Sequence, residues 1–298
     1  MKNNKLKIVF LGTPEFAVES LDAIIRSGHE VLAVVTATDK PAGRGHKLLP
    51  SAVKQYAVEH GIEVLQPEKL RDEAFLNRLR ELNADLNVVI AFRMLPREVW
   101  DMPRLGTMNL HASLLPRYRG AAPINHAVMN GDTETGVTTF LLKHEIDTGD
   151  MLCQEKISIA PDENVGSVHD RLMHLGADVV VRSINLLADG NVTPMPQNDE
   201  EATPAPKIFK DTCRLSSDMT AEQARNHVRG LSPYPCAWTD ELINGQTIKV
   251  LEAVHASEKR SGHLYMDFKD GFLELTRIQP AGKRPMSASD FLRGLRNT

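Results

Sequence analysis

The first half of the chain alternates short apolar runs with segments of helical periodicity, and this alternation restricts the fold more than any other feature. Residues 7–12 and 31–36 are rich in β-branched and apolar side chains, whereas residues 14–27 place apolar side chains at helical spacing. Residues 86–91 are almost entirely apolar, as is typical of a strand that is covered on both faces. The pattern predicts an α/β domain built on a doubly wound, mostly parallel sheet.

The same criteria predict the remaining elements. Helices are expected at residues 51–60, 68–82, 123–130, 165–187 and 220–229. Strands are expected at residues 63–65, 107–111, 135–142 and 151–159, and then at 237–242, 247–254, 263–267 and 271–278.

A stretch without periodicity divides the two groups of elements. Residues 190–206 hold four prolines among polar residues, which favours an extended linker. We therefore predict a first domain at 1–189, the linker at 190–206 and a second domain at 207–298. The short strands after the linker, with turns at Asn244-Gly245 and Asp270-Gly271, predict a small, open, OB-like β-barrel.

Composition excludes several classes of protein. Of the 298 residues, 42% are hydrophobic and 25% charged, and no apolar run approaches the roughly 20 residues that span a bilayer. The N-terminal apolar run is too short for a signal peptide, so we expect a cytoplasmic protein without a membrane partner. The three cysteines show neither paired nor metal-ligand spacing, which indicates no disulfide framework and no metal site. A monomer is the default expectation.

Charge is distributed unevenly along the chain. The net charge is −4, but residues 207–298 carry 14 basic and 11 acidic side chains, a net charge of +3. The asymmetry is small and is compatible with a polyanionic partner for the second domain.

An amide, an imidazole and a carboxylate stand close together in the predicted fold. Asn109 and His111 are two residues apart on a predicted strand, so they share one face of the sheet, and a loop rich in proline and glycine follows. Asp147 lies in the later Asp-Thr-Gly-Asp turn. These three groups suit transfer of a carbonyl group to a nitrogen nucleophile, with hydrogen bonds to an oxyanion and a carboxylate that moves a proton. The structural alternative is a satisfied core histidine, a strand-end asparagine and a turn aspartate.

Two glycine-containing loops leave alternatives open. Gly12-Thr13-Pro14 has one glycine where a dinucleotide fingerprint needs three, so it is either a tight turn or a ligand contact, and a nicotinamide cofactor is disfavoured. Residues 37–50 include Lys40, Arg44 and Lys47, and form either a solvated loop or an arm that contacts phosphate groups.

The order and spacing of these motifs closely resemble the folate-dependent formyltransferase family. The motifs that carry the resemblance are Asn-x-His at 109–111, Ser-Leu-Leu-Pro at 113–116, Arg-Gly-Ala-Ala-Pro-Ile at 119–124, Asp-Thr-Gly-Asp at 147–150, Leu-Gly-Thr-Pro-Glu-Phe at 11–16, Lys-Pro-Ala-Gly-Arg-Gly at 40–45 and Gln-Pro-Ala-Gly-Lys at 279–283. They cover nearly the whole chain. The resemblance implies a Rossmann-like catalytic domain followed by the barrel.

The resemblance also implies an activity and its residues. The formyl group would pass from 10-formyltetrahydrofolate to an amine, with Asn109, His111 and Asp147 as the catalytic set and no metal. The donor would bind against Ser113, Leu114, Leu115 and Pro116. Family members that act on glycinamide ribonucleotide are shorter and lack the residue 37–50 loop and the barrel, so the implied acceptor is methionyl initiator tRNA. The implied tRNA-binding residues are Lys40, Arg44, Lys47, Lys207, Lys210, Lys283 and Arg284.

One position departs from the family pattern. The family usually has Ala-Tyr-Gly where this chain has Ala91-Phe92-Arg93, and an arginine adds bulk and charge beside the expected pterin site. Three alternatives to tRNA formylation remain: a nucleotide-sugar N-formyltransferase, a formyltetrahydrofolate hydrolase, and a noncatalytic RNA-binding module with a decayed folate site.

Overall fold

The computed structural model describes residues 5–42, 47–243 and 245–296, and it groups them into two compact units. The first unit takes the described residues within Met1–Arg119, Gly136–Lys156 and Asp170–Thr203, and the second takes those within Gly120–Thr135, Ile157–His169 and Pro204–Thr298. The domain boundaries at 189 and 207 stay a prediction.

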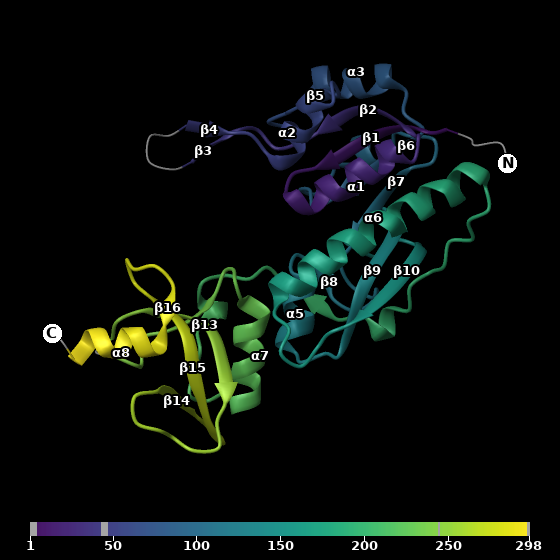
Figure 1. The fold of residues 1–298 in the computed structure, drawn as a ribbon. Coiled ribbons are helices and arrows are strands. Elements are labelled where there is room, and N and C mark those ends of the chain that lie inside the picture. Colours follow the sequence, from purple (N-terminus) through teal and green to yellow (C-terminus); the bar gives the residue numbers. More distant parts are fainter. Residues whose placement is uncertain (1–4, 43–46, 244, 297–298) are drawn as a thin grey trace. The chain divides into compact units, whose positions relative to one another are not determined.

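Seven strands form the central sheet (Figure 1). Across the sheet they run β10 (Met151–Ser158), β9 (Glu134–Leu141), β7 (Thr107–His111), β6 (Leu86–Ile90), β1 (Lys7–Gly12), β2 (Glu30–Val35) and β5 (Glu63–Leu65). The five strands from β7 to β5 pair in parallel, and β9 pairs with β7 in the antiparallel direction. The predicted doubly wound, mostly parallel sheet is confirmed.

Helices cover both faces of this sheet. They are α1 (Glu15–Arg26), α2 (Ala52–Glu59), α3 (Glu73–Leu82), α4 (Arg97–Trp100) and α6 (Val165–Asp189). Val9 and Leu11 of β1 join the apolar cluster that includes Phe75 and Leu79 of α3. Ile8 and Phe10 point to the other face, because side chains alternate along a strand, and they are fully buried as well.

The second unit is organised around an antiparallel sheet of five strands (Figure 1). Its strands are β12 (Ala237–Thr239), β13 (Ile248–His255), β15 (Gly271–Pro280), β14 (Leu264–Phe268) and β16 (Met286–Ser287). Its helices are α5 (Pro123–Met129), α7 (Ala221–Leu231) and α8 (Ala288–Arg296). Leu231, Val250 and Ile278 lie in one buried core, so α7 packs on the sheet as the OB-like prediction requires.

Most predicted elements are present with shifted ends. The helix expected at 68–82 begins only at Glu73, because the Asp72 side chain accepts the backbone N–H of Phe75 and caps the helix there. The strand expected at 237–242 ends at Thr239. Several elements carried too little periodicity to predict: α4, α8, β16 and the two-residue pair β8 (Arg119–Gly120) and β11 (Pro204–Ala205).

The loop expected at residues 37–50 contains a small hairpin. Strand β3 (Lys40–Ala42) pairs with β4 (Lys47–Leu49), and Arg44 lies outside the described residues. At the base of the hairpin, Asp39 accepts hydrogen bonds from Lys54 Nζ at 2.6 Å and Gln66 Nε2 at 2.8 Å. These bonds lower the pKa of the Asp39 carboxyl group.

No helix in the described part of the chain is long and apolar enough to cross a membrane.

Leu86 tests the packing of the sheet, because its side chain is fully buried in a central strand. We expect Leu86→Ala to lower the free energy of unfolding by about 2–5 kcal/mol through lost burial and the cavity left behind. Leu48→Ala removes the same atoms from a side chain that is 63% exposed. This control should change the free energy of unfolding by less than about 0.5 kcal/mol. Equal losses in urea unfolding of the two variants would contradict this description of the core.

Candidate active site

The carboxyl ends of the parallel strands create a natural ligand edge. Strands β2 and β6 flank β1 on opposite sides, so the order of the strands reverses between β1 and β6. Open α/β sheets bind ligands beyond the strand ends at such a reversal. Gly12 ends β1, and a Cβ added to it would lie only 2.8 Å from the Cβ of Ala17. This close approach of the chain supports the tight-turn interpretation.

His111, the last residue of the neighbouring strand β7, is held between two acceptors. Its Nε2 lies 2.8 Å from the Tyr118 carbonyl oxygen, and its Nδ1 lies 3.7 Å from Asp147 Oδ2. Because a carbonyl only accepts, Nε2 carries the proton in this contact, which leaves Nδ1 facing the carboxylate. The side chains of His111 and Asp147 are only 8% and 15% exposed, so both groups are largely shielded from water. The structure thus brings two of the three predicted catalytic residues together.

Asp147 reaches His111 from a tight loop between β9 and β10, residues 142–150, which we call the Asp147 loop. Asp147 itself has a φ of +56°, a left-handed conformation that aspartate tolerates better than most residues. A Cβ on Gly149 would lie 1.7 Å from the Leu141 carbonyl oxygen, so only glycine fits there. Lys143 Nζ and Asp150 Oδ1 close the loop with a 2.6 Å ion pair.

Asn109 is half-buried on β7, two residues before His111 and on the same face. Its backbone lies in the sheet between β6 and β9 partners. Among the described residues, its side-chain amide has no hydrogen-bond partner. An amide in this state can bind an incoming ligand without breaking an existing bond.

The predicted donor-binding loop mixes buried and accessible positions. The Ser113 side chain is buried and its hydroxyl donates to the Arg117 carbonyl oxygen at 2.7 Å, so it stabilises the loop itself. Leu115 and Pro116 are also buried and are joined by a cis peptide bond. Leu114 is half-buried, and a Cβ on Gly136 would come within 2.5 Å of its side chain. A ligand contact by these four residues stays a prediction.

Arg93 points toward protein backbone. Its guanidinium donates to the carbonyl oxygens of Glu68, at 3.0 Å, and of Pro67, and lies 5.7 Å from the centre of the Phe92 ring. The charge expected beside the pterin site therefore fastens the loop after β5 to the end of β6.

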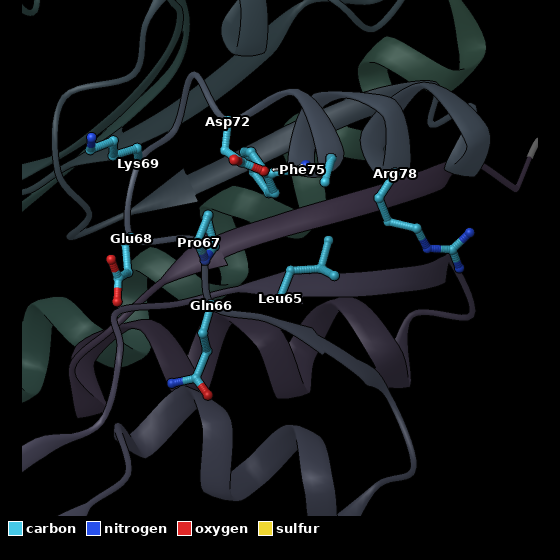
Figure 2. A pocket seen from close by; sticks show the side chains of 9 residues that line it. Leu65, Gln66, Pro67, Glu68, Lys69, Asp72, Phe75 and Arg78 are labelled. Carbon is cyan, nitrogen blue, oxygen red and sulfur yellow. Dashed lines mark hydrogen bonds between the residues drawn. The ribbon is translucent and has the colours of Figure 1, made fainter.

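That loop lines a cavity of about 580 Å³, which Figure 2 shows from close by. Glu68 and Lys69 project from the loop, whereas Arg78 projects from α3. Arg78 is engaged with both oxygens of Glu63, at 2.8 and 2.7 Å, which lowers the pKa of that carboxyl group. Asn109, His111 and Asp147 do not line this cavity, so we place the candidate site at the ends of the strands.

The predicted tRNA-binding residues that the structure describes are exposed. They are Lys40 in the first unit and Lys207, Lys210, Lys283 and Arg284 in the second. Lys47 lies on β4, and neither its side chain nor Arg44 is described. In the second unit Lys207 Nζ lies 5.6 Å from the centre of the exposed Phe209 ring, and Lys210 Nζ lies 5.4 Å from that of Trp238. Cations beside aromatic rings are a combination found on RNA-binding surfaces.

The described residues contain no group of three or more His, Cys, Asp and Glu side chains suited to holding a metal ion. The three cysteines are buried and unpaired.

Comparison with known families explains this arrangement of loops. Residues 6–184 match the formyl transferase domain, and residues 207–296 match the formyl transferase C-terminal domain. The chain belongs to the formyl transferase family. The motifs from which the resemblance was inferred are therefore those of a true family member.

Close relatives of this formyl transferase align from end to end. A methionyl-tRNA formyltransferase of Parabacteroides distasonis is 53% identical over 99% of this chain and 98% of its own length. A protein of the same name from Bacteroides fragilis is 50% identical over the whole of this chain and 98% of its own.

Solved structures share the fold at much lower identity. A sugar 3N-formyl transferase, WlaRD, superposes with a TM-score of 0.69 at 18% identity, covering 94% of this chain and 99% of its own. HypX from Aquifex aeolicus, solved with tetrahydrofolic acid, gives 0.68 at 16% identity over 96% of this chain. This chain spans about half, 47%, of the HypX chain.

Tyr118 also holds His111, although no sequence motif predicts it. Tyr118 supplies a backbone carbonyl oxygen 2.8 Å from His111 Nε2, and the residue itself has a positive φ of +63°. Nothing in its side chain marks a role played by its backbone, so the sequence pattern offered no signal.

Gly149 tests the geometry of the Asp147 loop in this formyl transferase. We expect Gly149→Ala to lower formyl transfer by at least about 10-fold, because the added Cβ displaces the loop and a shift near 1 Å at a reacting group is costly. Gly294→Ala is the matched control, since a Cβ there meets no atom within 4 Å. Wild-type activity in the Gly149 variant would contradict the tight packing of the loop.

Proposed function

We propose that this protein transfers the formyl group of 10-formyltetrahydrofolate to the free amino group of methionyl initiator tRNA, giving formylmethionyl-tRNA for translation initiation. The observation that carries the proposal is the end-to-end similarity to methionyl-tRNA formyltransferases, which spans both the catalytic and the C-terminal domains. We propose further that it acts in the cytoplasm as a monomer.

The candidate site fits a formyl donor and an amine. The free amide of Asn109 and the Nδ1 side of His111 lie on one face of β7 at the ligand edge of the sheet. Both can donate a hydrogen bond to one oxygen atom. When bound, 10-formyltetrahydrofolate supplies the formyl carbon and its oxygen.

Each residue then has a defined task. As the methionyl nitrogen bonds to the formyl carbon, Asn109 and protonated His111 donate hydrogen bonds to the oxygen on which negative charge develops. Asp147 holds His111 charged and accepts the proton that the amine loses. The bond from the formyl carbon to N10 of the folate then breaks, and the proton that Asp147 took from the amine passes to that nitrogen. No covalent bond to the protein is needed.

Electrostatics supports a tRNA acceptor. The second unit presents Lys207, Lys210, Lys283 and Arg284 to solvent, and the sequence from residue 207 onward carries a net charge of +3. We assign these residues, with Lys40, Arg44 and Lys47, to the tRNA phosphates and acceptor end. A sugar nucleotide or water as acceptor leaves the exposed basic residues of the second unit unexplained.

The function is tested by offering several acceptors in parallel. We expect transfer from 10-formyltetrahydrofolate to methionyl initiator tRNA, but none to uncharged tRNA, glycinamide ribonucleotide or an amino-sugar nucleotide. His111→Ala should reduce turnover by roughly 100- to 1,000-fold with tRNA affinity changed little, because the ring acts on the reacting oxygen.

Other outcomes identify the alternatives. Tetrahydrofolate release without transfer to any acceptor would make the protein a hydrolase, and preference for the sugar nucleotide would make it a sugar N-formyltransferase. Binding of tRNA with no turnover of folate would indicate a noncatalytic RNA-binding module.

Salt dependence tests the assigned phosphate contacts. We expect Lys207→Ala and Lys210→Ala each to weaken tRNA binding and to reduce the slope of log K against log salt by roughly 0.7–0.9, because each loses one phosphate contact. Lys259→Ala is the matched control, since Lys259 is already paired with Asp267. An unchanged slope in the first two variants would remove these residues from the interface.

A further inference from the structure

Gln197 lies in the segment predicted to be a linker, yet its side chain is tied to the Asp147 loop. Its Nε2 lies 2.8 Å from the carbonyl oxygen of Asp147 and 2.8 Å from that of Gly149. A primary amide has two N–H groups, so each carbonyl receives one of them. Gln197 thus holds the backbone on both sides of Thr148, through the carbonyl oxygens of Asp147 and Gly149.

Arg119 holds the other end of the same amide. Its Nε and NH2 groups donate to Gln197 Oε1 at 3.0 and 2.8 Å, and its NH2 group also meets Asp199 at 2.6 Å. Because the guanidinium has only donors and the two carbonyls have only acceptors, the amide has a single satisfactory orientation. The Arg119 side chain is 16% exposed, which favours a well-ordered contact.

The same segment also supports the opposite side of His111. Thr203 Oγ1 accepts the backbone N–H of Tyr118 at 2.9 Å, and the Thr203 carbonyl accepts that of Arg119 at 2.8 Å. Tyr118 is the residue whose carbonyl receives His111 Nε2. Residues 197–203 therefore brace both groups that contact the imidazole.

The positive φ of Asp147 explains why a clamp is useful. A non-glycine residue in this conformation is strained relative to ordinary backbone. Two hydrogen bonds, to the carbonyl oxygens of Asp147 and Gly149, hold the turn and with it the direction of the Asp147 carboxylate. Without them the loop can relax, although Lys143 and Asp150 would still close its ends.

We propose that Gln197 is a positioning residue for formyl transfer, acting through Asp147 and held in place by Arg119. This rests on the proposed function. The Gln197 amide bonds to backbone carbonyl oxygens and to Arg119, not to the reacting groups. Its effect on the reaction therefore requires the Asp147 carboxylate.

A double-mutant cycle tests this route. Gln197→Met removes the donors at similar size, and Gln197→Glu keeps the contact with Arg119 while facing two carbonyls with an acceptor. Both should lower kcat by roughly 10- to 100-fold with KM for either substrate changed less than about threefold. In an Asp147→Asn background, Gln197→Met should lower kcat by less than about twofold further. The control is Asn198→Ala, which should retain wild-type kcat. Asn198 is the next residue along the chain, and its side chain caps the short helix at 199–201.

Hydrogen exchange adds a readout that does not depend on turnover. Backbone amides of residues 143–150 should exchange faster in Gln197→Met than in wild type or Asn198→Ala. Wild-type kcat in Gln197→Met, or a loss that multiplies with that of Asp147→Asn, would overturn the proposal. If wild type transfers no formyl group but exchange still rises in the variant, the proposed function fails while the clamp stands.

Discussion

The placement of the His111 ring between the Tyr118 carbonyl and the Asp147 carboxylate is the interaction on which the rest of the site depends. Nε2 donates to the Tyr118 carbonyl oxygen, and this contact turns Nδ1 toward Asp147 Oδ2 at 3.7 Å, which is longer than a hydrogen bond. A donor that is already oriented toward developing charge needs no reorganisation during the reaction, which is the main source of electrostatic catalysis. The surrounding structure holds the His111 ring, the Tyr118 carbonyl and the Asp147 carboxylate in these positions.

Three parts of the chain that are distant in sequence supply that support. Strand β7 carries Asn109 and His111 in the sheet, the β9–β10 turn brings Asp147, and the segment at 197–203 fastens both neighbours of the ring. The turn is tight, because glycine at 149 allows the backbone to approach Leu141 closely. Sites built in this way retain their geometry when the substrate is absent.

The sequence predicted the sheet and the helices that cover it, because buried strands and amphipathic helices have periodic patterns. Spacing and resemblance also predicted Asn109, His111 and Asp147 as the catalytic set, and the structure brings His111 and Asp147 to 3.7 Å. The sequence did not identify Tyr118 or Gln197. Tyr118 acts through its backbone, and Gln197 sits in a proline-rich stretch whose contacts, 48 and 50 residues away, leave no local pattern.

The same reasoning applies to the contacts made by residues 190–206 and by Arg93. Residues 190–206 lack periodicity, which favoured an extended linker, and no sequence pattern indicates that Met195 pairs with Met151. Arg93 was expected to change the donor site through its charge. The guanidinium instead bonds to the carbonyl oxygens of Pro67 and Glu68, a contact that depends on how two loops meet.

Single-turnover formyl transfer by His111→Ala, Asp147→Asn and the double variant tests the central claim most directly. If Asp147 acts by holding His111 charged and by taking the proton that the same event releases, the two residues form one unit. The double variant should then be slower than the more damaged single variant by no more than about threefold. Losses that multiply would show that the two residues act independently, and would contradict the account.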